Sequence, residues 1–175
     1  TSPIRVRTVT DDPRKVTPGS RRHPRIRSCV AALAMLVAGL CAHDARADLI
    51  VLAGAQYALS SGLTDLACTD VVVAGALQVQ SGSLVNVRHL TILSGGSVDG
   101  GSGSIELGGN WSNAGSFAGG TGTVRFSDLC GLSSASIAGS SVYANAGFVT
   151  STGKSYVFAV GSTQTITGVL EIAGT

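Results

Sequence analysis

Two stretches decide the fold of this chain: Gly100-Gly-Ser-Gly-Ser-Ile-Glu-Leu and, nineteen residues later, Gly119-Gly-Thr-Gly-Thr-Val-Arg-Phe. Both follow the template Gly-Gly-x-Gly-[Ser/Thr]-[Ile/Val]-x-[Leu/Phe]. The glycine cluster is typical of a tight turn, and the alternating apolar residues after it are typical of a strand with one buried side. A turn and a strand that return at a fixed interval predict a chain that stacks coil upon coil.

The same interval extends beyond these two stretches. Four apolar positions recur every 18–20 residues, and four more follow them two residues later: Val85, Ile105, Val124 and Val142, then Val87, Leu107, Phe126 and Ala144. One coil cannot bury its own apolar face, but stacked coils place such residues in a continuous interior column. The sequence therefore predicts an all-β domain over residues 48–175, a parallel β-helix or solenoid with coils of about 18–20 residues.

The composition of residues 48–175 agrees with this architecture. The segment holds 22 of the 24 glycines, ten charged residues and no proline. Short β-branched runs alternate with Gly/Ser clusters, whereas a helix would need a long i, i+3, i+4 pattern. A β-sandwich with glycine-rich hairpins is the alternative, but it prefers two-residue Asn-Gly or Asp-Gly turns. Only Asp99-Gly100 fits that rule.

The glycine template raises the question of a calcium site. Nonapeptide repeats that bind calcium follow the pattern Gly-Gly-x-Gly-x-Asp-x-U-x, and the aspartate of each turn supplies the hard oxygen that the ion requires. Here Ile105 and Val124 occupy the aspartate position. The glycines are therefore predicted to turn the chain without binding a metal, and no cofactor is expected.

Residues 1–47 differ sharply in charge from the rest of the chain. Their net charge is +6, which leaves −4 for residues 48–175. A cluster of four arginines precedes a fourteen-residue apolar run, Cys29 to Ala42, and the tripeptide Ala45-Arg46-Ala47 follows. This order is typical of a secretory signal peptide cleaved between Ala47 and Asp48. We therefore expect residues 1–47 to be an upstream segment plus a signal-peptide helix.

Three alternatives explain this segment less well. A membrane anchor needs about 18 or more apolar residues, whereas this run has fourteen. An arm that binds nucleic acid would account for the arginines but not for the apolar run after them, so no nucleic-acid partner is expected. Lipid attachment at Cys41 would require a small residue before it, and Leu40 stands there.

The cysteines divide between the two segments. Cys29 and Cys41 would leave with the signal peptide. Cys68 and Cys130 would remain as an even pair in an oxidising compartment, so a disulfide between them is a candidate, and two separately buried thiols are the alternative. The chain has no Cys-x-x-Cys motif or Cys/His cluster, which argues against a zinc site.

Catalytic groups are sparse in residues 48–175. Asp65 with Asp70, and Asp99 with Glu106, are close enough in sequence to meet across a turn, but neither pair recurs one coil later to form a cluster. His89 is the one histidine of the segment, and no Gly-x-Ser-x-Gly motif accompanies it. Three aromatic residues offer a surface on which a sugar ring could stack, although packing in the core explains a lone tryptophan better: Trp111, Tyr143 and Tyr156.

Six runs of the chain share the pattern of a known family. They are Cys68-Thr-Asp-Val-Val-Val-Ala-Gly-Ala-Leu, Leu90-Thr-Ile-Leu-Ser-Gly-Gly-Ser-Val, Gly109-Asn-Trp-Ser-Asn-Ala-Gly-Ser-Phe, Gly122-Thr-Val-Arg-Phe, Cys130-Gly-Leu and Thr152-Gly-Lys-Ser-Tyr-Val-Phe. They resemble the Gly/Thr-rich exported repeat proteins of proteobacteria that end in an IPTL-type C-terminal sorting signal. The resemblance covers nearly all of residues 48–175, and its most specific part is the Asn-Trp-Ser-Asn-Ala-Gly-Ser-Phe block.

The resemblance implies surface anchoring and no catalytic residues. Ala118 stands where such repeats often have a proline before the glycine, a difference that affects only the stiffness of the turn. The chain also reaches Thr175 without the Ile-Pro-Thr-Leu tail, the membrane segment and the basic end of the family. We therefore expect this sequence to be an N-terminal fragment of a longer protein.

Together these features predict a secreted or cell-surface β-solenoid segment with a structural or adhesin-like role and no catalytic activity of its own. The expected location is the periplasm, the cell surface or the medium. The expected partners are surface polysaccharides or other matrix proteins, with membrane contact only through the export signal or a C-terminal anchor outside this sequence. The alternative is the N-terminal part of a lyase or hydrolase that acts on polysaccharides with a β-helix fold.

Export can be tested at the predicted cleavage site. Because small residues occupy positions −3 and −1, the protein recovered from the periplasm or medium of an exporting host should begin at Asp48 when its N-terminus is sequenced. Replacing Ala45 and Ala47 by large residues should leave the precursor uncleaved. An intact chain that stays in the cytoplasm would contradict the prediction.

Overall fold

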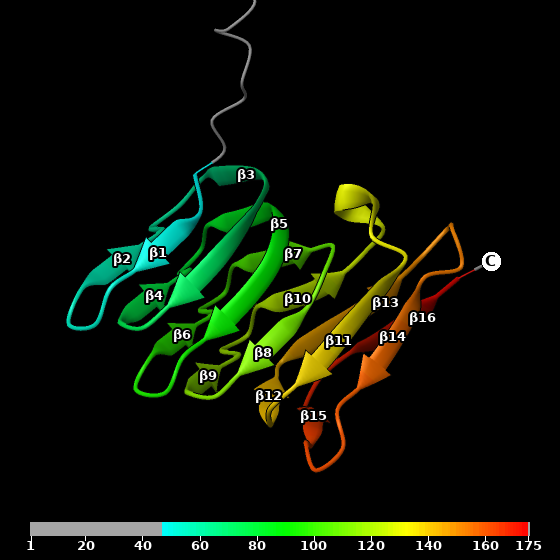
Figure 1. The fold of residues 1–175 in the computed structure, drawn as a ribbon. Helices are drawn as coiled ribbons and strands as arrows, with labels where there is room; N and C mark the ends of the chain where they lie inside the picture. Colours follow the sequence, from blue (N-terminus) through cyan, green and yellow to red (C-terminus); the bar gives the residue numbers. More distant parts are fainter. Residues whose placement is uncertain (1–46, 175) are drawn as a thin grey trace, which may run out of the picture. The chain divides into compact units, whose positions relative to one another are not determined.

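Residues 47–174, the part of the chain that the computed structural model describes, form a parallel β-solenoid (Figure 1). The chain winds through six coils, since each coil adds one strand to a six-stranded sheet. Neighbouring strands pair in parallel throughout these residues. This confirms the predicted parallel solenoid, whereas hairpins of a sandwich would pair antiparallel strands. The expected signal-peptide helix and Ala45 lie outside the described residues.

Each coil contributes a strand to each of three faces. The first face contains β1 (Leu49–Val51), the second halves of β3 (Leu63–Val73) and β5 (Ser83–Ile92), and then β8 (Trp111–Asn113), β11 (Ser134–Ala138) and β14 (Ser155–Phe158). The second face contains β2 (Gln56–Ala58), β4 (Ala76–Gln78), β6 (Ser97–Asp99), β9 (Ser116–Ala118), β12 (Ser141–Tyr143) and β15 (Gln164–Ile166). The third face contains the first halves of β3 and β5, and then β7 (Ser104–Leu107), β10 (Thr123–Phe126), β13 (Asn145–Val149) and β16 (Leu170–Ala173).

The corner between the third and first faces is built differently along the solenoid. β3 and β5 run through it without a break, so they are 11 and 10 residues long. They turn the corner at residues with left-handed backbone, Ala67 and Cys68 in β3 (φ 48° and 64°) and Asn86 in β5 (φ 55°). Asparagine adopts this region readily, whereas a residue such as Ala67 holds it at an energetic cost. The corner is therefore a place where surrounding contacts must hold the backbone.

The coils are longer and less regular than predicted. Along the first face, residues that pair coil by coil are separated by 22, 19, 21, 26 and 21 positions: Leu49, Val71, Leu90, Trp111, Ile137 and Phe158. The expected length of 18–20 residues therefore fits only one of these intervals. The longest interval holds the 3₁₀ turn η1 (Leu129–Gly131), which widens the same corner.

Five predicted core positions lie in two interior columns of the third face. Ile105 and Val124 are 1% and 4% exposed, and Val87, Leu107 and Phe126 are fully buried. The first column contains Leu84, Ile105, Val124, Ala146 and Leu170, and the second contains Val87, Leu107, Phe126, Phe148 and Ile172. Burial of each large apolar side chain contributes about 1.5–3 kcal/mol to stability.

Two predicted core positions, Val85 and Val142, are wrong. Val85 pairs with Asp65 on the outer surface, because a register shift after Leu84 inserts an extra residue before Val87. Val142 lies in β12 on the second face and is 50% exposed. A shift of one residue turns a strand side chain from the interior to the surface. The prediction assumed coils of nearly equal length, and it therefore placed Val85 and Val142 wrongly.

The Gly-Gly-x-Gly stretches form the turns between the second and third faces, as the sequence predicts. Gly101 and Gly120 adopt φ values of 56° and 58° and stack directly on each other. A Cβ atom added to Gly120 would lie 2.0 Å from the carbonyl oxygen of Gly101. The turn at Gly101 is closed by Asp99, whose Oδ1 accepts the N–H of Gly101 at 3.0 Å. Glycine is therefore needed here both for its conformation and for the close approach of the coils.

A carboxylate at Val124 tests the inward register. Val124→Asp should lower the free energy of unfolding by several kcal/mol, on the order of the penalty for burying an unpaired polar group. Val142→Asp places the same group on the surface and should change the melting temperature little. Calcium and a chelator should leave the melting temperature of the wild type unchanged. A rise with calcium would show that the glycine turns bind the ion, since a ligand of the folded state raises apparent stability.

Candidate functional site

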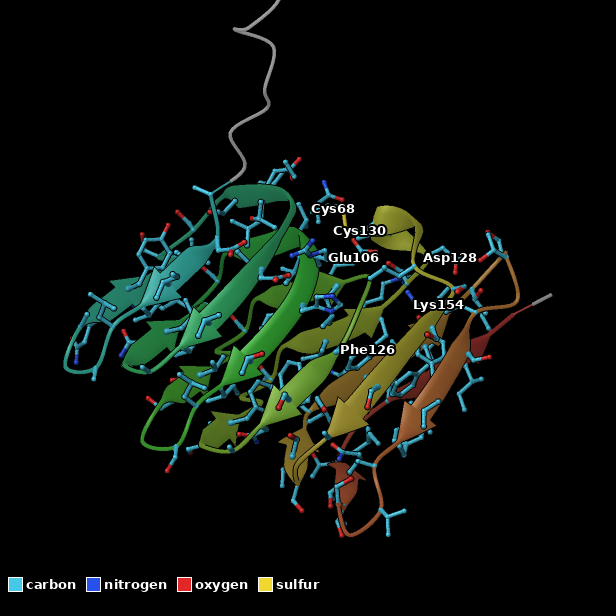
Figure 2. The ribbon with its side chains drawn as sticks, viewed as in Figure 1. Cys68, Glu106, Phe126, Asp128, Cys130 and Lys154 are labelled. Atoms are coloured by element: carbon cyan, nitrogen blue, oxygen red, sulfur yellow. A yellow bond between two sulfur atoms is a disulfide. The ribbon has the colours of Figure 1, made fainter. Side chains whose placement is uncertain are left out.

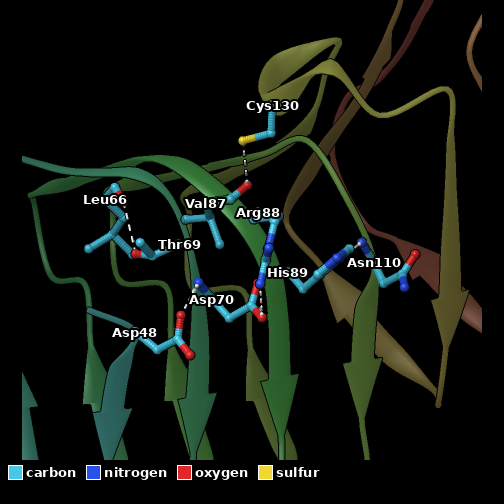
Figure 3. A network of polar contacts seen from close by, with 9 residues as sticks. All are labelled: Asp48, Leu66, Thr69, Asp70, Val87, Arg88, His89, Asn110 and Cys130. Atoms are coloured by element: carbon cyan, nitrogen blue, oxygen red, sulfur yellow. Dashed lines mark hydrogen bonds and ion pairs between the residues drawn. The ribbon is translucent and has the colours of Figure 1, made fainter. Parts of the chain in front are cut away.

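A column of polar residues lies along the corner between the third and first faces, and Figure 3 shows four of them below Cys130. Each member directly precedes the first-face strand, or the paired part of it, in successive coils: Asp48, Asp70, His89, Asn110 and Ser136. We refer to these five residues as the polar column. The column continues one coil further at Val157, which has no polar atom in its side chain.

Side chains of the polar column bind the main chain of the next coil. Asp48 Oδ1 accepts the N–H of Asp70 at 3.0 Å, and His89 Nδ1 accepts the N–H of Asn110 at 2.8 Å. Asn110 Oδ1 in turn accepts the N–H of Ser136 at 2.9 Å. These bonds satisfy main-chain donors at a corner where the strands are interrupted. Three acceptor atoms of the column therefore join neighbouring coils.

Asp70 is held by an arginine as well as by its place in the column. Arg88 donates from Nε and Nη2 to the two carboxylate oxygens, at 2.8 and 2.7 Å. Hydrogen bonds from Arg88 lower the pKa of Asp70 below its ordinary value, and the positive charge adds to the effect. The arginine therefore favours the ionised form of the Asp70 carboxylate, as an ion pair requires. The two partners neutralise each other at the surface.

The other carboxylates have partners of their own, and Glu106 and Glu171 share one partner, Arg125. Asp65 accepts the N–H of Ala67 and a bond from Asn86, both at 2.8 Å, and these bonds lower its pKa. Asp65 and Asp70 thus have separate partners. Glu106 lies 3.8 Å from Arg125, a contact that Asp99 in its glycine turn does not share. Asp65 and Asp99 thus bind the main chain of their own turns, and Glu106 belongs to an ion pair.

Cys68 and Cys130, the candidate pair from the sequence, are joined by a disulfide with an Sγ–Sγ distance of 2.14 Å (Figure 2). The bond ties the inserted 3₁₀ turn to the bend of β3. Both cysteines have left-handed backbone, with φ values of 64° and 63°. The bond closes a loop with a sequence separation of 62, and the chain-entropy model assigns about 4 kcal/mol of stability to a loop of this size.

The insertion also buries a lysine. Lys154 is 6% exposed, and its Nζ donates to the carbonyl oxygens of Gly108 and Ser127. Loss of hydration lowers the pKa of Lys154, partly opposed by the charge of nearby Asp128. The Lys154 Nζ also lies 5.9 Å from the centre of the Tyr156 ring. A charged group is thus used to satisfy carbonyl oxygens where the coil widens.

Asp128 stabilises the loop on the other side of the insertion. Its Oδ2 accepts the N–H of Thr152 at 3.1 Å and bonds from the main chain and hydroxyl of Ser151. These hydrogen bonds hold the pKa of Asp128 well below its ordinary value. Beside it lies a small cleft of about 250 Å³, lined by Asp128, Gly131, Leu132, Ser133 and Thr152. Lys154 and Asp128 could not be singled out from the sequence, because both stand in turn-like Gly/Ser stretches.

The aromatic residues do not form a sugar-stacking surface, and that hypothesis is wrong for Trp111 and Tyr143. Trp111 and Tyr143 are 0% and 1% exposed and pack against each other with ring centres 5.5 Å apart. The Nε1 of Trp111 donates to the buried Ser141 hydroxyl at 3.0 Å. Tyr156 is half-buried, and its hydroxyl lies 3.1 Å from the carbonyl oxygen of Phe126. Figure 2 places Phe126 inside the solenoid.

The last coil presents an open apolar groove of about 520 Å³. The inward-facing side chains of β14 and β16 line it, and they remain exposed because no further coil covers them within the described residues. Phe158 is 51%, Leu170 49% and Ile172 76% exposed. The groove is also lined by Phe148, Ser162, Thr163, Gln164 and Ile166. We refer to β14, β15 and β16 with this groove as the open coil.

Residues 47–174 contain no group of three or more His, Cys, Asp or Glu side chains placed to hold a metal ion. In the same part of the chain, no helix is long and apolar enough to cross a membrane. Comparisons with protein-family models, with curated proteins and with solved structures find no match to this chain.

Asp128→Asn tests the role of this carboxylate. A carboxylate whose pKa is lowered in the folded state stabilises the fold above its unfolded pKa, near 4, and this contribution is lost as the pH falls through the folded value. The substitution should therefore lower the melting temperature at pH 7 and have a smaller effect near pH 2. Glu106→Gln, which removes only a long surface ion pair, is the control and should change little. An effect of Asp128→Asn that is equal at both pH values would contradict this account.

Proposed function

We propose that this chain is an exported structural module of a cell surface or extracellular matrix, adhesin-like and without catalytic activity of its own. Its role is to present stacked, flat strand faces on a stiff support. Surface polysaccharides or other matrix proteins are the partners that such faces would contact. Export rests on the basic cluster, the apolar run and the Ala-x-Ala tripeptide of residues 1–47.

The observation that carries this proposal is the use of the polar residues at the corner. In parallel β-helices, a corner or face rich in acidic residues, arginine and histidine is where a polysaccharide-cleaving site would be sought. Here the acceptor atoms of Asp48, His89 and Asn110 bind main-chain N–H groups of the next coil, and Asp70 forms an ion pair with Arg88. Residues with these partners support the solenoid, and this use favours a structural role over acid–base catalysis.

Cross-links at the widened corner support a structural role. The disulfide between Cys68 and Cys130 joins parts of the chain that are far apart in sequence. Lys154 Nζ donates hydrogen bonds to the carbonyl oxygens of both Gly108 and Ser127. A disulfide of this kind suits an oxidising compartment outside the cytoplasm. A module that must keep its shape at a surface gains from such cross-links.

The outward side chains of the second face favour contact with polar, uncharged partners. Most are short or amide-bearing, such as Gln56, Gln78, Ser97, Ser116 and Thr165, and Asp99 is the one charged side chain among the outward residues of these strands. Hydroxyl and amide groups donate and accept hydrogen bonds with sugars without requiring an opposite charge. A flat face of this composition fits an extended polysaccharide better than an acidic or basic ligand.

The proposal predicts a binding protein without turnover. Purified protein from an exporting host should co-sediment with insoluble polysaccharides of the producing cell's surface, and no new reducing ends or unsaturated sugar products should appear over a long incubation. Replacing Gln78 and Ser97 by aspartate should weaken binding. The new carboxylates repel an acidic polymer, and the substitution removes the amide donor of Gln78 and the hydroxyl donor of Ser97 that a neutral polymer would use.

Arg88→Ala is the control for catalysis. It removes the partner of Asp70 and should lower stability without changing any polysaccharide product. Release of reducing ends or unsaturated products by the wild type, abolished in Arg88→Ala, would contradict the proposal and favour a polysaccharide lyase or hydrolase.

A further inference from the structure

Hydrogen bonds between coils occupy only one side of the polar side chains at the corner. His89 Nδ1 accepts the N–H of Asn110, so the proton of the neutral ring lies on Nε2. Asn110 Oδ1 accepts the N–H of Ser136, and the two N–H groups of its Nδ2 remain. Within residues 47–174, these remaining donors bind no other protein group. His89 is partly exposed and Asn110 is exposed, so both offer their donors at the surface.

Arg88 adds donors of the same kind next to His89. A guanidinium group carries five N–H groups, and Nε and Nη2 of Arg88 each give one to Asp70. The others remain on a side chain that is 46% exposed. The same ion pair neutralises Asp70, so this carboxylate repels an approaching anion less. Figure 3 shows Arg88, His89 and Asn110 in one line at the corner, with Cys130 above them. We refer to these three residues as the donor row.

The contact between coils does not itself require a donor. Asp48 makes the equivalent bond with Oδ1, and an ionised carboxylate has acceptors only. Aspartate, histidine and asparagine therefore serve this contact alike, and they differ in the atoms left at the surface. In the first coil the atom left is an acceptor, whereas in the donor row the atoms left are N–H groups. Stacking of the coils thus explains the acceptors of the donor row and leaves its donors for a ligand.

The surroundings of the donor row favour an anionic ligand. The first-face strands of the middle coils contain no acidic side chain: residues 89–92, 111–113 and 134–138. Thr91 and Ser112 pair with each other two positions after His89 and Asn110, so their hydroxyl groups lie on the same outer surface. Neighbouring parallel strands lie about 4.8 Å apart. Donors of two successive coils can therefore reach the oxygens of one carboxylate or of adjacent groups on a polymer.

We propose that the donor row binds carboxylate groups of an acidic polysaccharide. This inference rests on the proposed polysaccharide-binding role and assigns to it a second, separate surface, on the first face instead of the second. A carboxylate presents only acceptors and takes bonds from several donors at once. Hydrogen bonds to an ionised acceptor are about twice as strong as those between neutral groups. A polymer that follows the corner from coil to coil meets Arg88 and His89 in one coil and Asn110 in the next.

Two pairs of proteins differ in the outward atom and keep the bond between coils. Asn110→Asp retains Oδ1 as the acceptor for Ser136 and replaces the Nδ2 donor of the wild type by a carboxylate oxygen. His89→Asn and His89→Asp both offer an oxygen to the N–H of Asn110, as Asn110 and Asp48 do at equivalent positions, and only His89→Asn keeps a donor. Thr123→Asp adds the same charge at an exposed position of the third face and is the control.

The test titrates the exported protein with soluble polygalacturonate and with its neutral methyl ester in a calorimeter. The wild type and Thr123→Asp should bind polygalacturonate, less tightly at high salt, and should bind the ester more weakly. Asn110→Asp should raise the dissociation constant about tenfold or more, the effect of losing a bond to a charged group. His89→Asp should do the same relative to His89→Asn. Melting temperatures should agree within each pair, because the bond between coils is kept.

Three results would overturn the inference. They are a wild type that binds neither polygalacturonate nor alginate, binding by Asn110→Asp that equals the wild type, and equal binding by His89→Asn and His89→Asp. If Asn110→Asp does not fold, the His89 pair decides. A wild type that binds neutral polysaccharide through Gln78 and Ser97 but neither acidic polymer would defeat only this inference. A protein that binds neither neutral nor acidic polysaccharide would defeat the proposed function as well.

Discussion

The structure depends on the register between one coil and the next. A single coil of this chain is too short and too polar on its outer side to bury its own apolar residues, so each coil is stable only against its neighbours. Parallel hydrogen bonds fix the distance between coils, and the inward side chains then stack in columns such as Ile105 on Val124. Any departure from equal coil length must therefore be absorbed at a corner, where the strands are already interrupted.

The differences in coil length occur at the corner between the third and first faces. The polar contacts of this corner bind the main-chain groups that the strands leave without partners there. Where β5 crosses it, Asn86 supplies a left-handed residue, and the register shifts by one. Where the coil is longest, the inserted 3₁₀ turn lies over Gly108, with no room for a Cβ atom beneath Leu129. The disulfide, the hydrogen bonds of Lys154 and those of the polar column all join neighbouring coils at this corner. The polar groups that resemble catalytic residues in the sequence are thus gathered where the main chain lacks partners.

The architecture can be predicted from the sequence because each glycine turn is followed by a strand with two alternate apolar residues, and both of these face the interior. Ile105 and Val124, which follow matching turns, are placed correctly, and so are Leu107 and Phe126. The same rule fails at Val85 and Val142, because a bulge and an insertion change the register without changing the local pattern. Coil pairing is a property of segments some twenty residues apart, and a single sequence carries no direct measure of it.

The contacts at the corner were beyond prediction for a related reason. His89 looks like a lone histidine and Lys154 like a residue of an exposed turn until the coils are stacked, when His89 meets the main chain of Asn110 and Lys154 meets that of Gly108. Their partners are main-chain atoms, which every residue has, so no sequence motif marks them. The cysteine pair is different, since its chemistry admits few partners and the sequence offers two. Stacking thus places His89 and Lys154 against main-chain atoms of the neighbouring coil, and these contacts exist only once the register between coils is set.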